Sequence, residues 1–188
     1  MLFRSNIVIT GDPVLHNKAQ LVTEINDYIR DLVDDMYETM DEAPGVGLAA
    51  TQIGIPLSIF VFDWEDESGS YRGVAINPVL EISEVSEIDP DPDTETEGCL
   101  SVPGERFPLK RAQRAKLTAL DIAGQEFTIE ANGWLARIFQ HEYDHLQGTL
   151  YVDRLQEKFS KQAKRAIKSN GWGTKGLSWK PGEDFLEP

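Results

Sequence analysis

Two histidines four residues apart constrain this chain more than any other feature of its sequence. His141 and His145 bracket the segment His141-Glu142-Tyr143-Asp144-His145, and the chain has only three histidines in 188 residues. On an α-helix, residues four positions apart lie on the same face, so the two imidazoles can bind one metal ion. Glu142 projects to the side, where its carboxylate would lie close to a water molecule on that ion. The segment therefore predicts a helix that carries a metal site with a neighbouring acid/base.

The residues on both sides of this segment have the spacing of a helix. Apolar side chains recur every three or four positions from Trp134 to Phe139. Asn132 stands where a cap is expected, and Gly148 stands where a helix would end. The motif alone leaves a second interpretation open, in which both histidines are core or surface residues that bind no metal.

Composition and charge exclude several functional classes. The chain is 40% hydrophobic and 27% charged, which is typical of one globular domain with a substantial core. Its net charge of −14 disfavours binding to nucleic acid or to an anionic membrane surface. No run approaches the roughly 18 apolar residues that a membrane span needs, and the first residues lack the features of a signal peptide. A single cysteine cannot form an internal disulfide, so we expect a reducing compartment.

Periodicity and turn residues predict two further helices and several strands. The first helix is expected from Thr23, its cap, to Met40, and the last is opened by a capping box at 153–156 and runs to about Lys168. Strands are expected at residues 7–9, 58–62, 73–76, 117–122 and 126–130, the last two forming a hairpin. A polar loop over 63–70 is expected to join the strands at 58–62 and 73–76 as another hairpin. Trp172 and Trp179 indicate that the last residues form an ordered arm.

Four other features have ordinary structural interpretations when each is taken alone. The glycines at Gly45–Gly54 are typical of a turn, and the acidic run Glu81–Glu97 is typical of a solvated loop. His16 is expected on the surface without a role. A lone cysteine is most often buried and inert, but Cys99 follows a glycine, and this placement can present a thiolate at the edge of a strand. Because two histidines leave a catalytic metal one ligand short of three, a carboxylate or Cys99 would complete the set.

Three segments together carry a resemblance to a known family. GVGLAATQ (45–52), EGCLS (97–101) and QHEYDH (140–145) resemble the three signature motifs of the peptide deformylase family, in the family's order. The similarity continues between them through INP (76–78), SVPG (101–104) and LYVDR (150–154), and it covers roughly residues 1–165. Each motif alone is only moderately specific, whereas the three together are very specific.

The resemblance implies a fold and a set of roles. The expected fold is α+β, with antiparallel β-sheets around a central metal-binding helix, a long N-terminal helix packed outside, and a C-terminal helix plus tail. A single catalytic domain is expected over residues 1–170, with a tail over 171–188 packed on it. The implied metal ligands are Cys99, His141 and His145; the implied catalytic groups are the acid/base Glu142 and the oxyanion donors Gln52 and the backbone N–H of Leu100. The residues expected to contact the substrate are Val46, Gly47, Gly98, Arg137 and Ile138.

The resemblance also implies the reaction and its setting. The reaction is removal of the formyl group from the N-terminal formylmethionine of newly made polypeptides, with release of formate. One divalent metal is implied, ferrous iron (Fe2+) by preference, with zinc, nickel or cobalt able to occupy the site. The implied partners are N-formylmethionyl nascent polypeptides, with the ribosome as a candidate docking partner, and the implied location is the bacterial cytoplasm.

Two other functions share part of this pattern. A zinc endopeptidase of the HExxH type would use the same helix with a downstream histidine or glutamate as third ligand, but no histidine follows His145. A non-catalytic module with a structural metal would ordinarily close its coordination with four protein ligands, often several cysteines. The single cysteine argues against that module, and so does Glu142, which it would not need.

Overall fold

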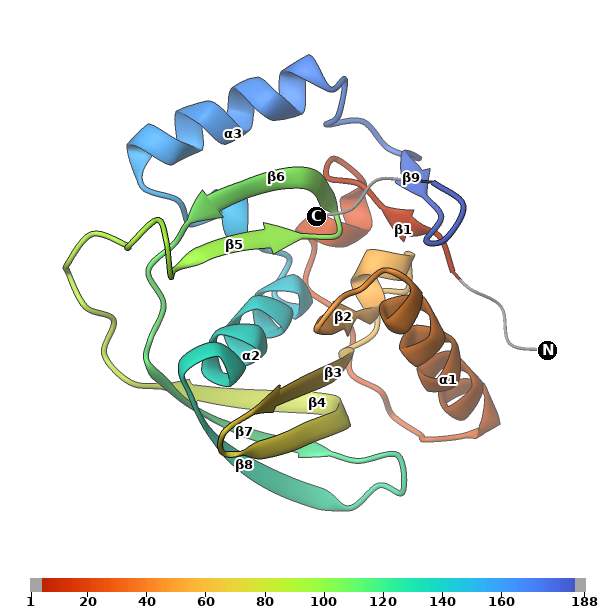
Figure 1. Cartoon of the computed structure of the whole chain (residues 1–188). Coiled ribbons are helices and arrows are strands. Elements are labelled where there is room, and N and C mark those ends of the chain that lie inside the picture. Colours follow the sequence, from red (N-terminus) through yellow and green to blue (C-terminus); the bar gives the residue numbers. More distant parts are fainter. Residues whose placement is uncertain (1–4, 185–188) are drawn as a thin grey trace.

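The computed structural model describes residues 5–184 as an α+β fold built around one central helix. The helix α2 (Gly133–Leu146) lies between a five-stranded antiparallel sheet and a separate two-stranded hairpin, while α1 and α3 lie outside these layers (Figure 1). This is the arrangement that the resemblance implied. The ends of the expected domain and tail, residues 1–4 and 185–188, lie outside the described residues. Within 5–184, no helix has the length and apolar character needed to cross a lipid bilayer.

The large sheet has the strand order β2-β3-β4-β7-β8, and every neighbouring pair is antiparallel. Its strands are β2 (Gly47–Ala49), β3 (Ile59–Asp66), β4 (Gly69–Ile82), β7 (Arg114–Leu120) and β8 (Glu126–Asn132). The hairpin predicted at 117–130 is confirmed as β7 and β8. The hairpin predicted for the strands at 58–62 and 73–76 is confirmed as β3 and β4, but the extent of the polar loop at 63–70 is wrong, because the two strands stay paired as far as Asp66 and Gly69. Both faces of the β3–β4 pair are largely open to water over residues 63–70, so polar side chains do not interrupt these strands.

One face of α2 packs on this sheet, and the opposite face meets the hairpin of β5 (Thr96–Cys99) and β6 (Val102–Pro108). Phe139 of α2 meets the ring of Phe62 edge to face, with 5.0 Å between centroids. The predicted boundaries hold, since Asn132 precedes the helix and Gly148 follows it in a left-handed conformation with φ of 74°. Asn132 makes no side-chain capping bond. Both histidines of the motif therefore sit in the middle layer, facing the hairpin.

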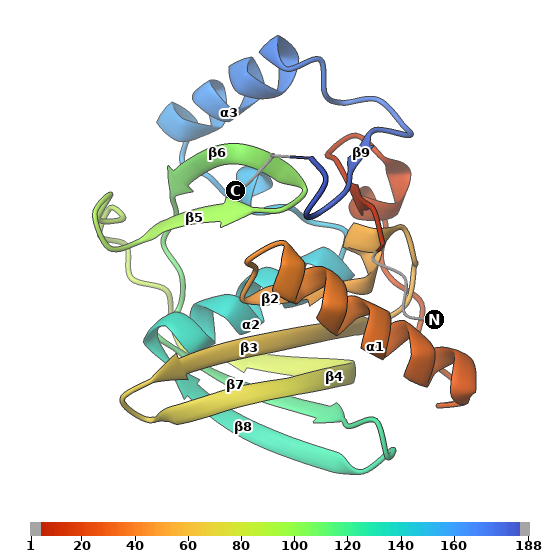
Figure 2. The same ribbon diagram turned by 45° about the vertical axis from the view of Figure 1, so that its right-hand side comes forward.

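The first helix, α1 (Asp27–Glu42), begins later than predicted. Its cap is Asn26, whose side chain accepts a hydrogen bond from the N–H of Ile29 at 3.2 Å, so Thr23 is not the cap. An amide oxygen three residues before a free N–H is the geometry that a cap requires. The apolar face of α1 packs against β2 and β3, as Figure 2 shows. This contact fixes β2, which carries Gly47 of the first motif.

The last helix, α3 (Glu157–Ser169), also begins later than the predicted capping box. Asp153 instead closes a short 3-10 turn, Tyr151–Asp153, where its carboxylate accepts from the N–H of Leu150 at 2.9 Å. Asp153 therefore closes this 3-10 turn instead of opening α3, and sequence spacing does not distinguish these two roles. Beyond α3 the chain returns to the N-terminal segment, where β9 (Ser178–Trp179) pairs antiparallel with β1 (Ile7–Val8) (Figure 1).

Candidate metal centre and active site

The fold brings one cysteine and two histidines to a single point. Cys99 ends β5, and His141 and His145 lie one turn apart on α2. One ligand atom from each lies within 4.8 Å of the others, and Cys99 Sγ is 3.3 Å from His145 Nε2. This is the group of potential ligands that residues 5–184 assemble, and no carboxylate belongs to it. A thiolate and two imidazoles suit a transition-metal ion that keeps an open position.

The surroundings of these side chains fit a cation. His141 Nδ1 lies 3.0 Å from a carboxylate oxygen of Glu97, which leaves Nε2 for a metal. Burial lowers the pKa of His141, but hydrogen bonds with Cys99 and Glu97 outweigh this effect and raise the pKa well above its usual value. The position therefore favours a positive charge, which a divalent ion would supply. Burial lowers the pKa of His145, which favours the neutral imidazole that binds metals.

Glu142 lies beside these potential ligands and is 4% exposed. Burial raises the pKa of its carboxyl group to about 7, against the opposing charge of His141. Its Oε2 atom is buried and has no hydrogen-bond partner among the described residues. A buried polar atom of this kind indicates an exchangeable partner, such as a reacting water. A carboxyl group with this pKa can both accept and return a proton near neutral pH.

The glycine-rich segment Gly45–Gly54 does more than turn the chain. It forms β2 and then a 3-10 turn, Ala50–Ile53, so the interpretation as an ordinary turn is wrong. A Cβ atom on Gly47 would lie only 2.4 Å from Oε1 of Glu142. Real Cβ atoms do not approach other atoms so closely, so the carboxylate can occupy this position only beside a glycine.

Two potential hydrogen-bond donors, from Gln52 and Leu100, lie near Cys99. Gln52 is 1% exposed, and its Oε1 accepts from the N–H of Ala49 at 2.9 Å, which fixes the amide orientation. Its Nε2 then lies 3.7 Å from Cys99 Sγ. Leu100 follows Cys99 in the turn between β5 and β6, and outside the strand ladders no backbone hydrogen bond of residues 5–184 uses its N–H.

Buried charges hold the side chain of His141 in place. The carboxylate of Glu97 accepts from Arg111 Nε at 2.9 Å and from Arg137 Nη1 at 2.7 Å. Burial alone would raise the pKa of Glu97, but His141 and Arg111 hold it far below its usual range. Arg111 also contacts Asp144 at 2.6 Å. Glu97 therefore stays ionised and orients the imidazole.

This network corrects one prediction and adds residues that sequence reasoning missed. The run Glu81–Glu97 was expected to be solvated throughout, but Glu95 and Glu97 are 8% and 3% exposed. Both are paired, Glu95 with Lys110 at 2.8 Å and Glu97 with the arginines. Asp144 and Arg111 were not identified from the sequence. Asp144 lies inside the HExxH motif, which was a usable signal, whereas Arg111 lies in no recognisable motif.

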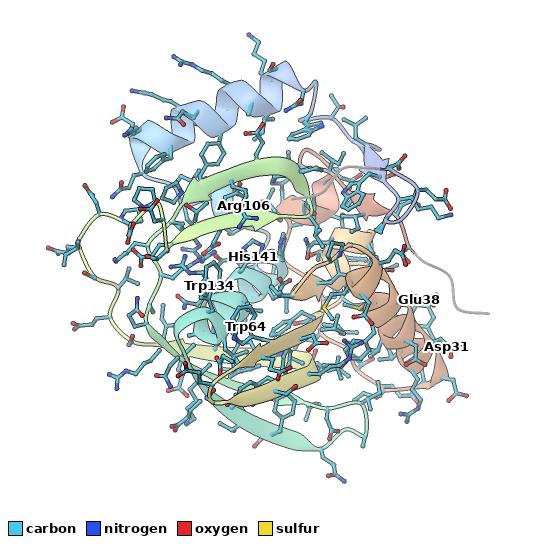
Figure 3. The ribbon with its side chains drawn as sticks, viewed as in Figure 1. Asp31, Glu38, Trp64, Arg106, Trp134 and His141 are labelled. Atoms are coloured by element: carbon cyan, nitrogen blue, oxygen red, sulfur yellow. The ribbon has the colours of Figure 1, made fainter. Side chains whose placement is uncertain are left out.

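A cavity of about 310 Å³ is lined by Cys99 and His141 of this group. It is also lined by each of the five residues expected to contact the substrate: Val46, Gly47, Gly98, Arg137 and Ile138. The guanidinium of Arg137 points to Glu97 and to the carbonyl of Leu109, both at 2.7 Å. Its charge is therefore satisfied by the protein. Near the mouth, Trp64 and Trp134 lie 6.2 Å apart between ring centroids (Figure 3).

The geometry agrees with comparisons to known proteins. The family model described as polypeptide deformylase matches residues 4–161. The chain belongs to this family. It is 54% identical over 185 residues to a peptide deformylase of Mycobacteroides abscessus, with 94% of each chain covered, and 53% identical to peptide deformylase 2 of Corynebacterium efficiens.

Solved structures of peptide deformylases have the same fold. A crystal structure from Ehrlichia chaffeensis aligns with a TM-score of 0.78 and 35% identity, over 90% of this chain and 97% of that one. A second structure of the Ehrlichia chaffeensis enzyme, in complex with actinonin, aligns with the same TM-score and 37% identity.

The remaining histidine, His16, does not belong to the group of potential ligands. It is exposed and accepts a hydrogen bond from the N–H of Gly11.

Proposed function

We propose that this chain is a metallohydrolase that removes the N-formyl group from the N-terminal formylmethionine of newly made polypeptides and releases formate. One observation carries the proposal: Cys99, His141 and His145 converge at one point, and Cys99 and His141 line a cavity that Glu142 also lines. In a member of the deformylase family, this arrangement provides both a metal site and an acid/base for hydrolysis of the formyl amide.

Each step has a residue that can perform it. A divalent ion bound by Cys99, His141 and His145 would polarise the formyl carbonyl and lower the pKa of a water molecule. Glu142 accepts the proton of the attacking water and returns it to the leaving amine. The Nε2 amide of Gln52 and the N–H of Leu100 donate to the carbonyl oxygen as it gains charge, and each such donor contributes about 3 kcal/mol.

The substrate would bind as an extended chain between two strands. Val46 and Gly47 border the cavity at the start of β2, and Gly98 borders it on β5, so strand backbone lies on both sides of it. Arg137 and Ile138 line the part of the cavity next to His141, where the methionine side chain would lie. Since the charge of Arg137 is paired with Glu97, its aliphatic stem can form an apolar wall.

The proposal extends to the ion and the setting. A single soft thiolate beside two imidazoles suits ferrous iron, with zinc, nickel and cobalt as alternatives. The partners would be nascent formylated polypeptides in the bacterial cytoplasm, with the ribosome as a docking candidate. The chain itself carries a net charge of −14, which disfavours direct contacts with nucleic acid or an anionic membrane.

The test is formate release by protein that is purified without oxygen and loaded with ferrous iron. A formyl-Met-Ala-Ser peptide is expected to yield formate and a free amine, while the acetylated peptide is expected to react far more slowly. Mass spectrometry of a longer peptide separates the alternatives, since an HExxH endopeptidase would cut internal bonds. Internal cleavage without formate release would overturn the proposal, and so would a loaded protein that cleaves neither bond.

A further inference from the structure

Residues 171–184, here called the C-terminal arm, are held against the N-terminal segment by backbone contacts. Ser178 and Trp179 pair with Val8 and Ile7 in the β1–β9 ladder. The N–H of Ile9 donates to the carbonyl of Leu177 at 2.9 Å, and the N–H of Gly173 donates to the carbonyl of Thr10 at 3.0 Å. The arm and the N-terminal segment therefore form one unit, which lies beside the β5–β6 hairpin (Figure 2).

This unit reaches the turn that follows the ligand Cys99. Trp179 is 3% exposed, and its indole N–H donates to the carbonyl oxygen of Leu100 at 2.8 Å. The N–H of Thr10 donates to the carbonyl of Ser101 at 2.8 Å. Both carbonyls of the two-residue turn are thus fixed from outside the hairpin. Neither Trp179 nor Thr10 lines the cavity, whereas Leu100 does.

We infer that Trp179 is a positioning residue for the reaction: its indole fixes the turn at Leu100 so that the N–H of Leu100 faces the reacting carbonyl oxygen. This inference rests on the proposed function. The peptide plane that carries the N–H of Leu100 begins at Cys99, the last residue of β5, and it meets the plane of the Leu100 carbonyl at Cα. Because the strand holds one end, fixing the carbonyl at the other end restricts the rotations that would turn the N–H away. The burial of Leu100 and Trp179 in one apolar cluster supports the same orientation.

The position of the bond explains why a residue so far along the chain would affect catalysis. An oxyanion donor works only when it is already aimed at the place where charge develops. Gln52 is fixed by the N–H of Ala49 within its own segment. Leu100 lies in a turn, where local backbone contacts hold the conformation less firmly, so the external bond from Trp179 supplies the missing constraint.

The test is Trp179→Phe, which keeps an aromatic ring and removes the N–H donor. We expect kcat for a formyl-Met peptide to fall about tenfold, less than the 10²–10³ that loss of a whole donor causes. KM and metal content are expected to stay within twofold of wild type. The matched control is Trp172→Phe in the same arm. The indole of Trp172 is partly buried and donates to no described residue, so this variant should keep the wild-type kcat.

A second readout separates positioning from general stability. The amide of Ser101 shares its peptide plane with the Leu100 carbonyl, so its 15N chemical shift should change in Trp179→Phe and not in Trp172→Phe. If Trp179→Phe fails to fold, the sulfur isostere 3-benzothienylalanine, introduced at position 179 alone, removes the donor with little change in shape. A kcat within twofold of wild type in a fully metallated, folded variant would overturn the inference, as would an unchanged Ser101 shift. Failure of the wild-type protein to release formate would instead overturn the proposed function.

Discussion

The carboxylate of Glu142 lies against the backbone of Gly47, and this contact shows how two distant motifs depend on each other. Gly47 is on β2 and Glu142 is on α2, yet no side chain larger than hydrogen fits between them. The burial that results raises the pKa of Glu142 to about 7. The glycine therefore affects the chemistry as well as the backbone.

Gly47→Ala is expected to abolish most activity while the metal stays bound. The added Cβ would lie 2.4 Å from Oε1 of Glu142, so the carboxylate must move away from the reacting water. A displacement of about 1 Å can lower the rate by about 100-fold. The comparison variant is Gly45→Ala, whose Cβ would meet the flexible end of Leu100 at 3.2 Å and should have a much smaller effect. Steady-state kinetics and metal analysis of both variants provide the check. Equal activity in the two would show that the contact is not functional.

Glu142→Ala separates catalysis from metal binding. Turnover is expected to fall by about 10²–10⁴-fold, the usual effect of losing a general acid/base, because one carboxyl group serves both proton transfers. Metal content and product affinity should remain close to those of wild type, since Glu142 is not among the converging ligand atoms. Glu142→Asp keeps the carboxyl group but shortens its reach, so it should recover only part of the rate. Loss of the metal in Glu142→Ala would instead identify Glu142 as a ligand.

At the scale of single residues, sequence spacing indicated some residues of the candidate site and could not indicate others. His141 and His145 follow from helical periodicity, because a four-residue step fixes their relative position. Cys99 was one of several possible third ligands until the motifs were considered together. Arg111 could not be identified from the sequence, because its role depends on contacts with Glu97 and Asp144, which lie 14 and 33 positions away in the chain.

At the scale of elements, the joint between β5 and α2 is made of buried charges. Glu97 on β5 and Asp144 on α2 both bind Arg111, whose side chain is 6% exposed. Arg137 of α2 adds a second bond to Glu97. A pair of this kind contributes little over an apolar replacement, but removing one partner leaves an uncompensated buried charge. The joint is therefore sensitive to single substitutions.

Arg111→Met should lower the free energy of unfolding by about 3–5 kcal/mol, because it removes a cation shared by two buried carboxylates. The metal affinity should fall as well, since Glu97 would no longer be held in place beside His141. Arg154→Met is the control: Arg154 also binds Asp144, but its side chain is 49% exposed. Urea unfolding of both apoproteins, with metal titrations, measures the two effects. A loss in Arg111→Met no greater than in Arg154→Met would contradict the shared-cation interpretation.

Helices and strands were predictable where the apolar periodicity was strong. The predictions failed where polar residues had tertiary partners. The helices follow from apolar spacing, but the first residues of α1 and α3 do not, because Asn26 caps α1 and Asp153 closes a 3-10 turn through contacts that only the structure defines. The polar segment at 63–70 became strand through pairing with its neighbour. Glu95 and Glu97 were assigned to a solvated loop because their cationic partners lie elsewhere in the chain.

At the scale of the whole molecule, the candidate metal centre joins two layers that the buried charges around Glu97 also connect. Cys99 belongs to the hairpin and the histidines belong to α2, which packs on the large sheet. An ion bound to all three would hold the hairpin against the helix. Since the unfolded chain does not keep these ligands together, metal binding should add directly to the stability of the fold.

Removal of the ion should therefore lower the melting temperature as well as abolish activity. An ion present at about a thousand times its dissociation constant stabilises a protein by about 4 kcal/mol. Because about 1 kcal/mol shifts the melting temperature by about 2–4 °C at this chain length, chelation should lower it by about 10 °C. Readdition of ferrous or nickel ion should restore it. Cys99→Ala is the control, since its melting temperature should already be low and should not respond to the chelator. If chelation removed the ion from the wild-type protein without changing its melting temperature, the ion would serve the chemistry alone, and the buried charges at Arg111 would have to hold the two layers together.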